Sequence, residues 1–259
     1  ELFVSGRISL LGGLSDLVSP YLDENKNLIP GSAIAAGIDR GIYANVNQSD
    51  FLEFEMGKRK RKIDMKKESL EEQIKNNTFY SYICGVALCM KEKYKVSGIK
   101  IEITKMDLPM KKGLASSAAI CVLAVRAWNQ IYNLNLTTEE EKELAYEGEH
   151  LAGSKCGRLD QICASGKKLY KITFFKDYAK TEEIKVKEPL NMVIADLNSY
   201  KDTKKIMKDL NKCFPFPHNE KEKVVHEMVG IKNKELVEKA KQCIENGDKE
   251  TLGHILNNA

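Results

Sequence analysis

The spacing of apolar residues along the chain predicts which segments form strands and which form helices. Segments that are rich in β-branched residues, or that alternate apolar and polar positions, predict strands. They are residues 1–11, 34–46 (as a strand pair or one long bent strand), 99–103, 169–175 and 191–197. Apolar residues at helical spacing predict helices instead. These helices cover residues 78–94, 116–132, 138–148, 204–211, 221–229, 234–246 and 249–256.

Two of the predicted helices carry further information. Residues 116–132 are apolar on most faces, so this helix is expected in the centre of the fold. At the start of 138–148, Thr138 is followed three residues later by Glu141, which predicts a capping box. Along the chain the elements are first mainly strands, then mixed, then all helical. This order predicts an α+β protein with two lobes and no flexible linker between them.

The composition excludes several classes of protein. With 259 residues, 42% of them hydrophobic and 30% charged, the chain is typical of a globular protein of one large or two small domains. Its 41 Lys and Arg against 37 Asp and Glu give a net charge of +4, which is too small to indicate a nucleic-acid partner. No run approaches the ~18 apolar residues of a membrane helix, so no membrane partner is expected either.

The cysteines favour an intracellular protein. Their number, seven, is odd, and no zinc-like Cys-x-x-Cys pair is present. Reduced thiols are therefore a better interpretation than a secreted protein with disulfides, and no signal peptide is visible. Because the first residue is Glu1 rather than Met, a few residues are expected to be missing at the start. We predict a cytoplasmic protein and leave its oligomeric state open.

The most basic part of the chain lies in residues 58–67. It contains Lys58, Arg59, Lys60, Arg61, Lys62, Lys66 and Lys67. One interpretation is a patch that binds a polyanion, and the other is a solvated hairpin tip or surface strand. No aromatic residues interleave these charges, so no platform for stacking bases is indicated. We favour the solvated hairpin tip or surface strand.

The strongest chemical signal is the segment Pro109-Met110-Lys111-Lys112-Gly113-Leu114-Ala115-Ser116-Ser117-Ala118, between a predicted strand and the apolar helix. Gly113 allows the backbone to approach a ligand closely, and the first N–H groups of the helix lack intrahelical partners. Those donors and the positive end of the helix suit a phosphate group. A serine hydroxyl there can also bind Mg²⁺ that phosphates already hold. The alternative is an ordinary serine cap on a buried helix.

This segment is not a Walker loop, because the sequence Gly-Lys-Ser/Thr is absent. Any phosphate site here is therefore built in a different way.

A second set of candidates is formed by Glu149 and the segment Cys156-Gly157-Arg158-Leu159-Asp160-Gln161. An Asp in a loop that contains glycine can orient or deprotonate a hydroxyl that accepts a phosphoryl group. A second carboxylate can help to hold Mg²⁺. On spacing alone, however, two carboxylates near a loop are more often a solvated face.

A third candidate is Arg7, in the segment Ser5-Gly6-Arg7-Ile8-Ser9-Leu10-Leu11-Gly12-Gly13-Leu14-Ser15-Asp16. An arginine inside an apolar strand is costly unless it is paired. Arg7 is therefore a candidate partner for a buried carboxylate, which such a charge would keep ionised. The alternative is an arginine on an edge strand that reaches water.

Taken in order, these three segments resemble motifs of the GHMP kinase superfamily, named for galactokinase, homoserine, mevalonate and phosphomevalonate kinases. Pro-x-x-x-Gly-Leu-x-Ser-Ser-Ala at 109–118 resembles its phosphate-binding motif. Gly-Arg-Ile-x-Leu-x-Gly at 6–12 resembles the first motif of the family. Cys-Gly-x-x-Asp-Gln at 156–161 resembles the galactokinase form of its catalytic loop. The resemblance covers residues 1–246. It implies transfer of the γ-phosphoryl group of ATP, with Mg²⁺, to the hydroxyl of a small molecule.

The fold that the resemblance implies is α+β with two lobes. The N-terminal lobe is expected to resemble domain 2 of ribosomal protein S5, and the C-terminal lobe to be helical and ferredoxin-like. We place the lobes at residues 1–185 and 186–259 and expect the second to be incomplete. The third, Gly-rich motif of the family has no counterpart in the sequence. Either the end of this lobe is missing or the motif has been lost.

The resemblance also implies roles for individual residues. Asp160 would be the catalytic base and Arg7 its charged neighbour, while Ser117 and Glu149 would bind the metal. The residues implied to bind ATP and its phosphates are Pro109, Lys111, Lys112, Gly113, Leu114, Ala115, Ser116, Ser117 and Ala118. Those implied to bind the acceptor are Gly12, Gly13, Asp16, Gly157 and Asp160.

The acceptor is expected to be a sugar or sugar acid. Asp16 matches the Asp with which galactokinases bind the sugar, but Gly13-Leu14 replaces the Glu-His pair that precedes it there. We therefore expect a sugar or uronic acid other than galactose. The segment Lys201-Asp202-Thr203 also resembles a substrate-side element of the family. Two alternatives are a mevalonate-type kinase of isoprenoid synthesis and a catalytically silent ligand-binding module on the same fold.

Overall fold

The structure is a computed structural model that describes residues 1–76, 78–109, 112–193, 195, 206 and 209–259. By its internal contacts the chain divides into two compact units. Unit 1 comprises Glu1–Ile8 and Gly37–Lys167, and unit 2 comprises Ser9–Ala36 and Lys168–Ala259. Each unit is built from two stretches of chain. The lobes 1–185 and 186–259 stay a prediction, because compactness in space does not by itself define a domain boundary.

Unit 1 contains strands in the order β4–β3–β5–β2, with β1 also paired to β2. The strands are β1 (Leu2–Leu11), β2 (Ser32–Gln48), β3 (Leu52–Met56), β4 (Arg59–Ile63) and β5 (Ile99–Met106). β3 is parallel to β5 and antiparallel to β4. β5 is antiparallel to β2, with a register shift between Tyr43 and Ala44. β1 and β2 both continue from one unit into the other.

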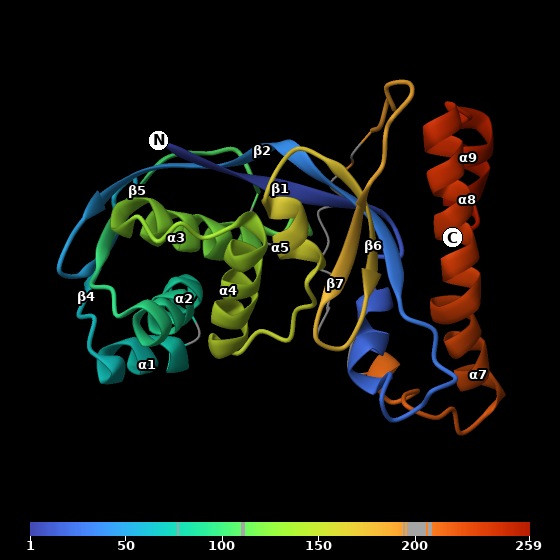
Figure 1. The fold of residues 1–259 in the computed structure, drawn as a ribbon, viewed down its shortest axis with the longest axis horizontal. Coiled ribbons are helices and arrows are strands. Elements are labelled where there is room, and N and C mark those ends of the chain that lie inside the picture. Colours follow the sequence, from blue (N-terminus) through green and yellow to red (C-terminus); the bar gives the residue numbers. More distant parts are fainter. Residues whose placement is uncertain (77, 110–111, 194, 196–205, 207–208) are drawn as a thin grey trace. The chain divides into compact units, whose positions relative to one another are not determined.

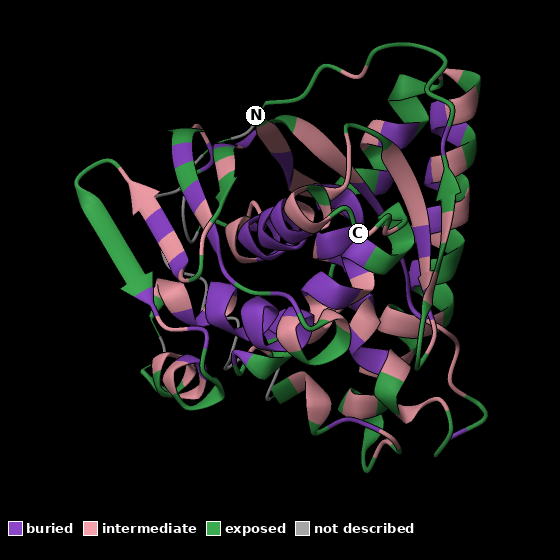
Figure 2. Cartoon of the chain, turned by 60° about the vertical axis from the view of Figure 1, so that its left-hand side comes forward, coloured by how far each residue is buried: buried purple, intermediate pink, exposed green. Residues whose placement is uncertain are grey.

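The helices of unit 1 lie on one side of its strands (Figure 1). They are α1 (Lys67–Lys75), α2 (Phe79–Tyr94), α3 (Ser116–Tyr132), α4 (Thr138–Leu151) and α5 (Leu159–Ala164). α3 is buried along most of its length, as its all-round apolar sequence requires, and Figure 2 shows buried helices inside the unit. The indole N–H of Trp128 donates to the carbonyl of Ser97 at 2.9 Å, so its one polar atom has a partner in the core.

Unit 2 begins with the 3₁₀-helix η1 (Ser15–Tyr21) and the first residues of β2. β6 (Leu169–Phe174) is antiparallel to this part of β2 and to β7 (Ala179–Glu183). The remaining elements are α7 (Glu220–Glu227), the π-helical turn η2 (Met228–Lys232), α8 (Asn233–Asn246) and α9 (Lys249–Asn257). α8 and α9 bury Val237, Ile244 and Ile255 in one cluster with Ile34 and Ile184. Burial of this apolar stripe stabilises the C-terminal helices.

The α+β class is confirmed, and so are most of the predicted elements. α3 has the predicted bounds, and residues 34–46 belong to one long strand rather than to a pair. The sequence pattern did not predict η1, β3, α1, α5 or β7. Among the described residues no helix is both long and apolar enough to cross a membrane.

The predicted strand at 191–197 is wrong for the residues that the structure describes. Residues 191–193 and 195 belong to no strand, and the side chain of Val193 is fully open, with 97% of the residue exposed. Of the apolar residues that suggested a strand here, Met192 and Val193 are therefore not part of a buried face. The rest of this segment, the Lys201-Asp202-Thr203 element and residues 204, 205, 207 and 208 of the predicted helix 204–211 lie outside the described residues. Residues 206 and 209–211 are helical, as predicted.

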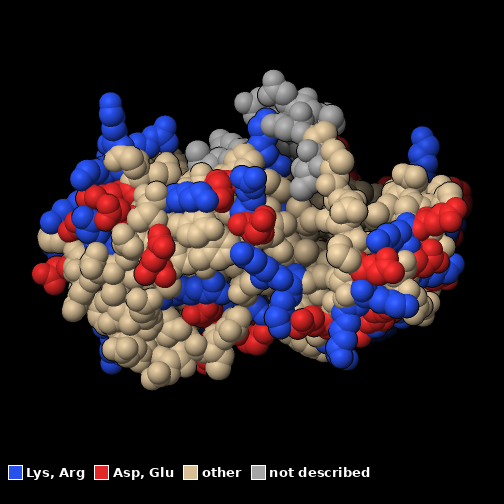
Figure 3. Space-filling model, turned by 90° about the horizontal axis from the view of Figure 1, so that it is seen from above, with Lys and Arg blue, Asp and Glu red and all other residues tan. Residues whose placement is uncertain are grey.

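Within the basic stretch, residues 59–63 form β4, a surface strand at the edge of the sheet, and Lys66 and Lys67 lie at the start of α1. On β4, Lys60 and Lys62 form ion pairs with Glu55 and Glu53 of β3 at 3.3 and 3.5 Å. Arg61 points to the other face of the strand and lies over the ring of Tyr80. On the face drawn in Figure 3, positive and negative side chains are interspersed. The exposed lysines protect the edge against pairing with another strand.

The capping box at the start of α4 lies one residue earlier than predicted. The hydroxyl of Thr137, not of Thr138, accepts from the N–H of Glu140 at 3.3 Å, and the Glu140 carboxylate accepts from the N–H of Thr137 at 2.7 Å. Glu141 is only 8% exposed and points inward. Both Thr–Glu pairs fit the sequence pattern, and the burial of Glu141 decides between them.

We predict that Thr137→Ala lowers the free energy of unfolding by about 1 kcal/mol, because the helix loses its side-chain cap. Urea denaturation of the purified protein measures this change. Thr138→Ala, at the exposed first position of the helix, is the matched control and should change stability by less than about 0.5 kcal/mol. Equal effects of the two substitutions would place the cap at the wrong residue.

Candidate functional site

The turn between β5 and α3 presents backbone N–H groups rather than side-chain caps. Gly113 and Ala115 both have a left-handed backbone, with φ of 77° and 61°. This conformation is unfavourable for alanine because its Cβ crowds the following carbonyl. An unfavourable backbone conformation persists only where contacts with the rest of the protein stabilise it, so such contacts must hold this turn. No side chain of the described residues caps α3 at Ala115. The first N–H groups of α3 therefore suit an anion.

The other predicted phosphate-binding residues lie around this turn. Pro109 and Lys112 are exposed, Leu114, Ser116 and Ser117 are half-buried, and Ala118 is buried in the first turn of α3. A Cβ built on Gly113 meets nothing within 4 Å, so the turn leaves open space on this side. Lys111 lies outside the described residues.

Arg7 on β1 links this turn to Asp160. Its Nε donates to Asp160 Oδ1 at 2.7 Å, and its Nη2 lies 2.5 Å from the same oxygen. Its Nη1 donates to the carbonyl of Gly113 at 3.0 Å, and its backbone N–H donates to the carbonyl of Leu114 at 3.1 Å. The predicted carboxylate partner of Arg7 is thus Asp160. One guanidinium fixes both the turn before α3 and the start of α5.

Asp160 lies in the first turn of α5, and its side chain stays 24% exposed. The other face of this short helix is apolar and buried, through residues such as Leu159 and Ile162. The hydroxyl of Ser5 donates to the carbonyl of Cys163 at 3.1 Å and gives a second link between β1 and α5. The buried apolar face and the contacts of Arg7 and Ser5 hold α5 in place. Asp160 lies at the end of this helix that is accessible to solvent.

Glu149 on α4 is a buried carboxylate, 2% exposed, whose partners are neutral donors. Gln161 donates to its Oε2 at 2.7 Å, Ser154 donates to its Oε1 at 3.4 Å, and Ser117 also donates a hydrogen bond to it. Burial raises the pKa of Glu149 to about 7, the hydrogen bond from Ser117 lowers it, and the charge of Asp160 raises it. The two residues expected to bind metal, Ser117 and Glu149, are therefore in contact.

The donor set fits Mg²⁺, which prefers hard oxygen ligands. Ser117 provides a hydroxyl group. Glu149 provides a carboxylate, and because this carboxylate is buried, its negative charge would be stabilised by a cation nearby. No group of three or more His, Cys, Asp or Glu side chains among the described residues forms a metal site by itself. Any cation here would therefore need further oxygen ligands from a phosphate or from water.

Most of the residues expected to bind the acceptor lie in unit 2. Gly12 has a φ of 70°, and a Cβ there would lie 2.1 Å from the carbonyl oxygen of Ser32, so only glycine fits. Gly13 follows as an exposed residue, and Asp16 is half-buried in the first turn of η1. Gly157 lies instead in unit 1, in the loop before α5. The structure brings together Arg7, Asp160, Ser117 and Glu149 within unit 1.

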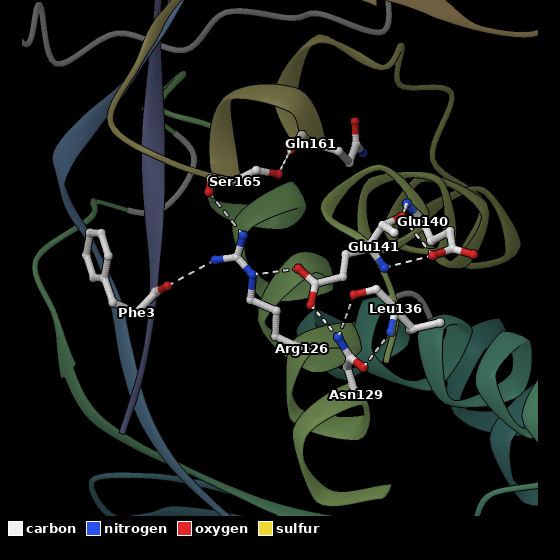
Figure 4. A network of polar contacts seen from close by, with 9 residues as sticks. Phe3, Arg126, Asn129, Leu136, Glu140, Glu141, Gln161 and Ser165 are labelled. Carbon is white, nitrogen blue, oxygen red and sulfur yellow. Dashed lines mark hydrogen bonds and ion pairs between the residues drawn. The ribbon is translucent and has the colours of Figure 1, made fainter. Parts of the chain in front are cut away.

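Sequence reasoning assigned no role to two polar residues of unit 1, the buried Gln161 and the half-buried Arg126. Gln161, 1% exposed, donates to Glu149, and Arg126 on α3 binds acceptors from three elements (Figure 4). The available signal for Arg126 was a single charged side chain inside an apolar helical run, and for Gln161 it was its place in the Cys-Gly-x-x-Asp-Gln motif. Neither signal identifies the partners of the side chain, although a polar group in apolar surroundings must have some.

Comparison with known proteins matches residues 81–167 to the family model described as GHMP kinases N terminal domain. Galactokinase from Thermotoga petrophila is 30% identical over 166 residues, which cover 63% of this chain and 43% of that protein. The chain thus aligns with less than half the length of this curated relative.

Solved structures show the same fold. Lactococcus lactis galactokinase, determined in complex with galactose, superposes with a TM-score of 0.69 and 16% identity, covering 99% of this chain and 72% of that one. Mevalonate kinase from Methanococcus jannaschii gives a TM-score of 0.64 and 15% identity, covering 98% and 75%. The fold is that of GHMP kinases, and the resemblance drawn from the three sequence motifs is confirmed.

Proposed function

We propose that this chain, with its GHMP kinase fold, is an ATP-dependent kinase that transfers the γ-phosphoryl group to a hydroxyl of a sugar or sugar acid. The observation that carries the proposal is the position of Arg7, which binds both Asp160 and the turn before α3. A kinase of this kind needs an acceptor-activating group next to a phosphate-binding group. The galactokinase relative supports a sugar as the acceptor.

The phosphates of ATP would bind at the N-terminus of α3. Its first N–H groups, the left-handed turn at Gly113 and Ala115, and the positive end of the helix suit a polyphosphate without any covalent chemistry. Pro109, Lys111, Lys112, Leu114, Ser116, Ser117 and Ala118 complete the proposed phosphate-binding segment. Its exposed lysine, Lys112, would add positive charge.

Asp160 would act as the general base. Both contacts of Arg7 fall on Oδ1, so the hydroxyl of the acceptor would donate its proton toward Oδ2. The ion pair restricts the rotation of the carboxylate, and this orientation contributes to catalysis because the proton must travel along a short hydrogen bond. Gly157, in the preceding loop, would lie with Asp160 on the acceptor side of the site.

Ser117 and Glu149 would hold Mg²⁺, together with oxygens of the nucleotide phosphates. When bound, this ion neutralises negative charge that develops on the transferred group. The hydrogen bonds from Gln161 and Ser154 orient the Glu149 carboxylate beforehand.

Asp16, with Gly12 and Gly13, would bind the acceptor. A carboxylate that accepts hydrogen bonds from two neighbouring hydroxyls suits a polyol ring and disfavours the carboxylate of mevalonate. Because Gly13-Leu14 lacks the Glu-His pair of galactokinases, we propose a hexose or uronic acid other than galactose.

We expect Asp160→Asn to lower turnover by roughly 10²–10⁴-fold, the usual contribution of a general base, with little change in ATP affinity. A coupled ADP-release assay measures turnover, and a fluorescent nucleotide titration measures affinity. The matched control is Glu143→Gln, which removes a carboxylate from another arginine pair of the same unit, that with Arg158 at 2.9 Å. Turnover of Asp160→Asn within a few-fold of wild type would refute the role.

Ser117→Ala should raise the Mg²⁺ concentration needed for half-maximal turnover by about tenfold, because a ligand oxygen is removed. Titration of Mg²⁺ at fixed ATP gives this value. Ser116→Ala, which changes the adjacent hydroxyl, is the control and should leave the metal dependence close to that of wild type. An unchanged dependence in Ser117→Ala would show that the hydroxyl is not a ligand.

A screen of ATP consumption over hexoses, uronic acids, galactose and mevalonate identifies the acceptor. We expect a non-galactose sugar or uronic acid to be used best, and Asp16→Ala to raise its KM or lower its turnover by at least tenfold. Asp23→Ala, at an exposed position of unit 2, is the control. Use of mevalonate alone, without an effect of Asp16→Ala, would favour an isoprenoid kinase. No consumption with any acceptor would favour a silent module.

A further inference from the structure

We infer that Arg126 is a positioning residue that sets the geometry of the Arg7–Asp160 pair from the opposite end of β1 and α5. The catalytic part of this inference rests on the proposed kinase function. Arg126 is the one charged residue of α3, and its side chain is 18% exposed. A charge inside an apolar helix is costly unless its donors are all used, so its partners define its role.

The guanidinium of Arg126 binds three different elements of unit 1 (Figure 4). Its Nη1 donates to the carbonyl of Phe3 on β1 at 3.2 Å, and its Nη2 donates to the carbonyl of Ser165, directly after α5, at 3.1 Å. Its Nε donates to the carboxylate of Glu141 on α4 at 2.8 Å. The planar fork of an arginine can make these contacts together in one fixed geometry, which lysine cannot reproduce.

The orientation of this fork is set by a buried network. The other oxygen of Glu141 accepts from Asn129 at 2.9 Å, and Asn129 also binds the N–H and the carbonyl of Leu136. Only 10% of the Glu141 side chain is exposed, so its ion pair with Arg126 is shielded from water and salt. The guanidinium of Arg126 is therefore held in one orientation. It can restrain β1 and α5 because it does not move with them.

Three polar links then join β1 to α5 and its last turn. Arg7 binds Asp160, Ser5 binds the carbonyl of Cys163, and Phe3 is linked to Ser165 through Arg126. The contacts come from residues 3, 5 and 7 of β1, and residues 3 and 7 of a strand are about 13 Å apart. α5 is thus linked to β1 at Asp160 in its first turn and at Cys163 and Ser165 at its C-terminal end.

Without Arg126, the C-terminal end of α5 would keep its contact with Ser5 but lose its links to Phe3 and Glu141. A helix of six residues moves nearly as one body, so looser attachment at Ser165 would increase the motion of the whole helix and disturb the geometry of the Arg7–Asp160 contact at its other end. A misplacement of about 1 Å at a catalytic group costs up to about 10²-fold in rate. Arg126 would therefore affect turnover without touching the nucleotide or the acceptor.

The test compares Arg126→Met with Trp128→Phe. Trp128 lies on the same helix and also donates to a backbone carbonyl, that of Ser97, but it has no link to β1 or α5. Both substitutions are expected to lower thermal stability. Only Arg126→Met is expected to lower kcat by 10- to 100-fold, with the ATP dissociation constant within threefold of wild type. Hydrogen exchange should become at least tenfold faster at the amides of residues 159–165 in Arg126→Met and stay unchanged in Trp128→Phe.

Normal kcat in Arg126→Met, unchanged exchange at 159–165, or the same loss of kcat in Trp128→Phe would each overturn the inference. If Arg126→Met does not fold, Arg126→Lys, which keeps the charge facing Glu141 but not the fork, provides the same two measurements. If the wild-type protein consumes no ATP with any acceptor, the proposed function fails. The exchange measurement then still decides whether Arg126 holds α5.

Discussion

The site depends on one constraint, the need of a guanidinium group inside a strand to satisfy its donors. Arg7 has five N–H groups and only 18% of its side chain is exposed, so it must find acceptors in the protein. It finds them on Asp160 and Gly113, which lie far apart in the sequence. Asp160 and the N-terminus of α3 are neighbours because both bind the same cation. The proposed base and the proposed phosphate site follow from this single pairing.

Two glutamates of α4 show how different partners prepare buried carboxylates for different tasks. Glu141 has a full positive charge beside it, that of Arg126, and so its negative charge is already balanced. Among the described residues, Glu149 has the neutral donors Ser117, Ser154, Cys156 and Gln161, and burial raises its pKa. The electrostatic attraction between a cation and Glu149 would therefore be stronger than that between a cation and Glu141. The contrast supports a structural task for Glu141 and a ligand-binding one for Glu149.

Much of the fold and part of the site could be predicted from the sequence. The bounds of α3 were correct because its apolar residues leave no alternative environment. Arg7 was a candidate for a carboxylate partner because an unpaired charge is costly, and the structure favours this over an arginine that reaches water. The cap of α4 was misplaced because Thr137 and Thr138 fit the same pattern. The role of Arg126 could not be predicted, since two of its acceptors are backbone carbonyls, which every residue carries.

The way in which the chain passes between the units has a consequence for biosynthesis. Unit 1 is complete once Lys167 has been added, whereas unit 2 needs Ser9–Ala36 together with everything that follows. During synthesis the residues 32–36 of β2 therefore precede their partner strand, β6, by more than one hundred residues. In that interval the backbone groups of residues 32–36 that face β6 in the finished protein stay hydrated or bind elsewhere. The first unit can thus form before the second, and it carries a strand edge that waits for β6 as its partner.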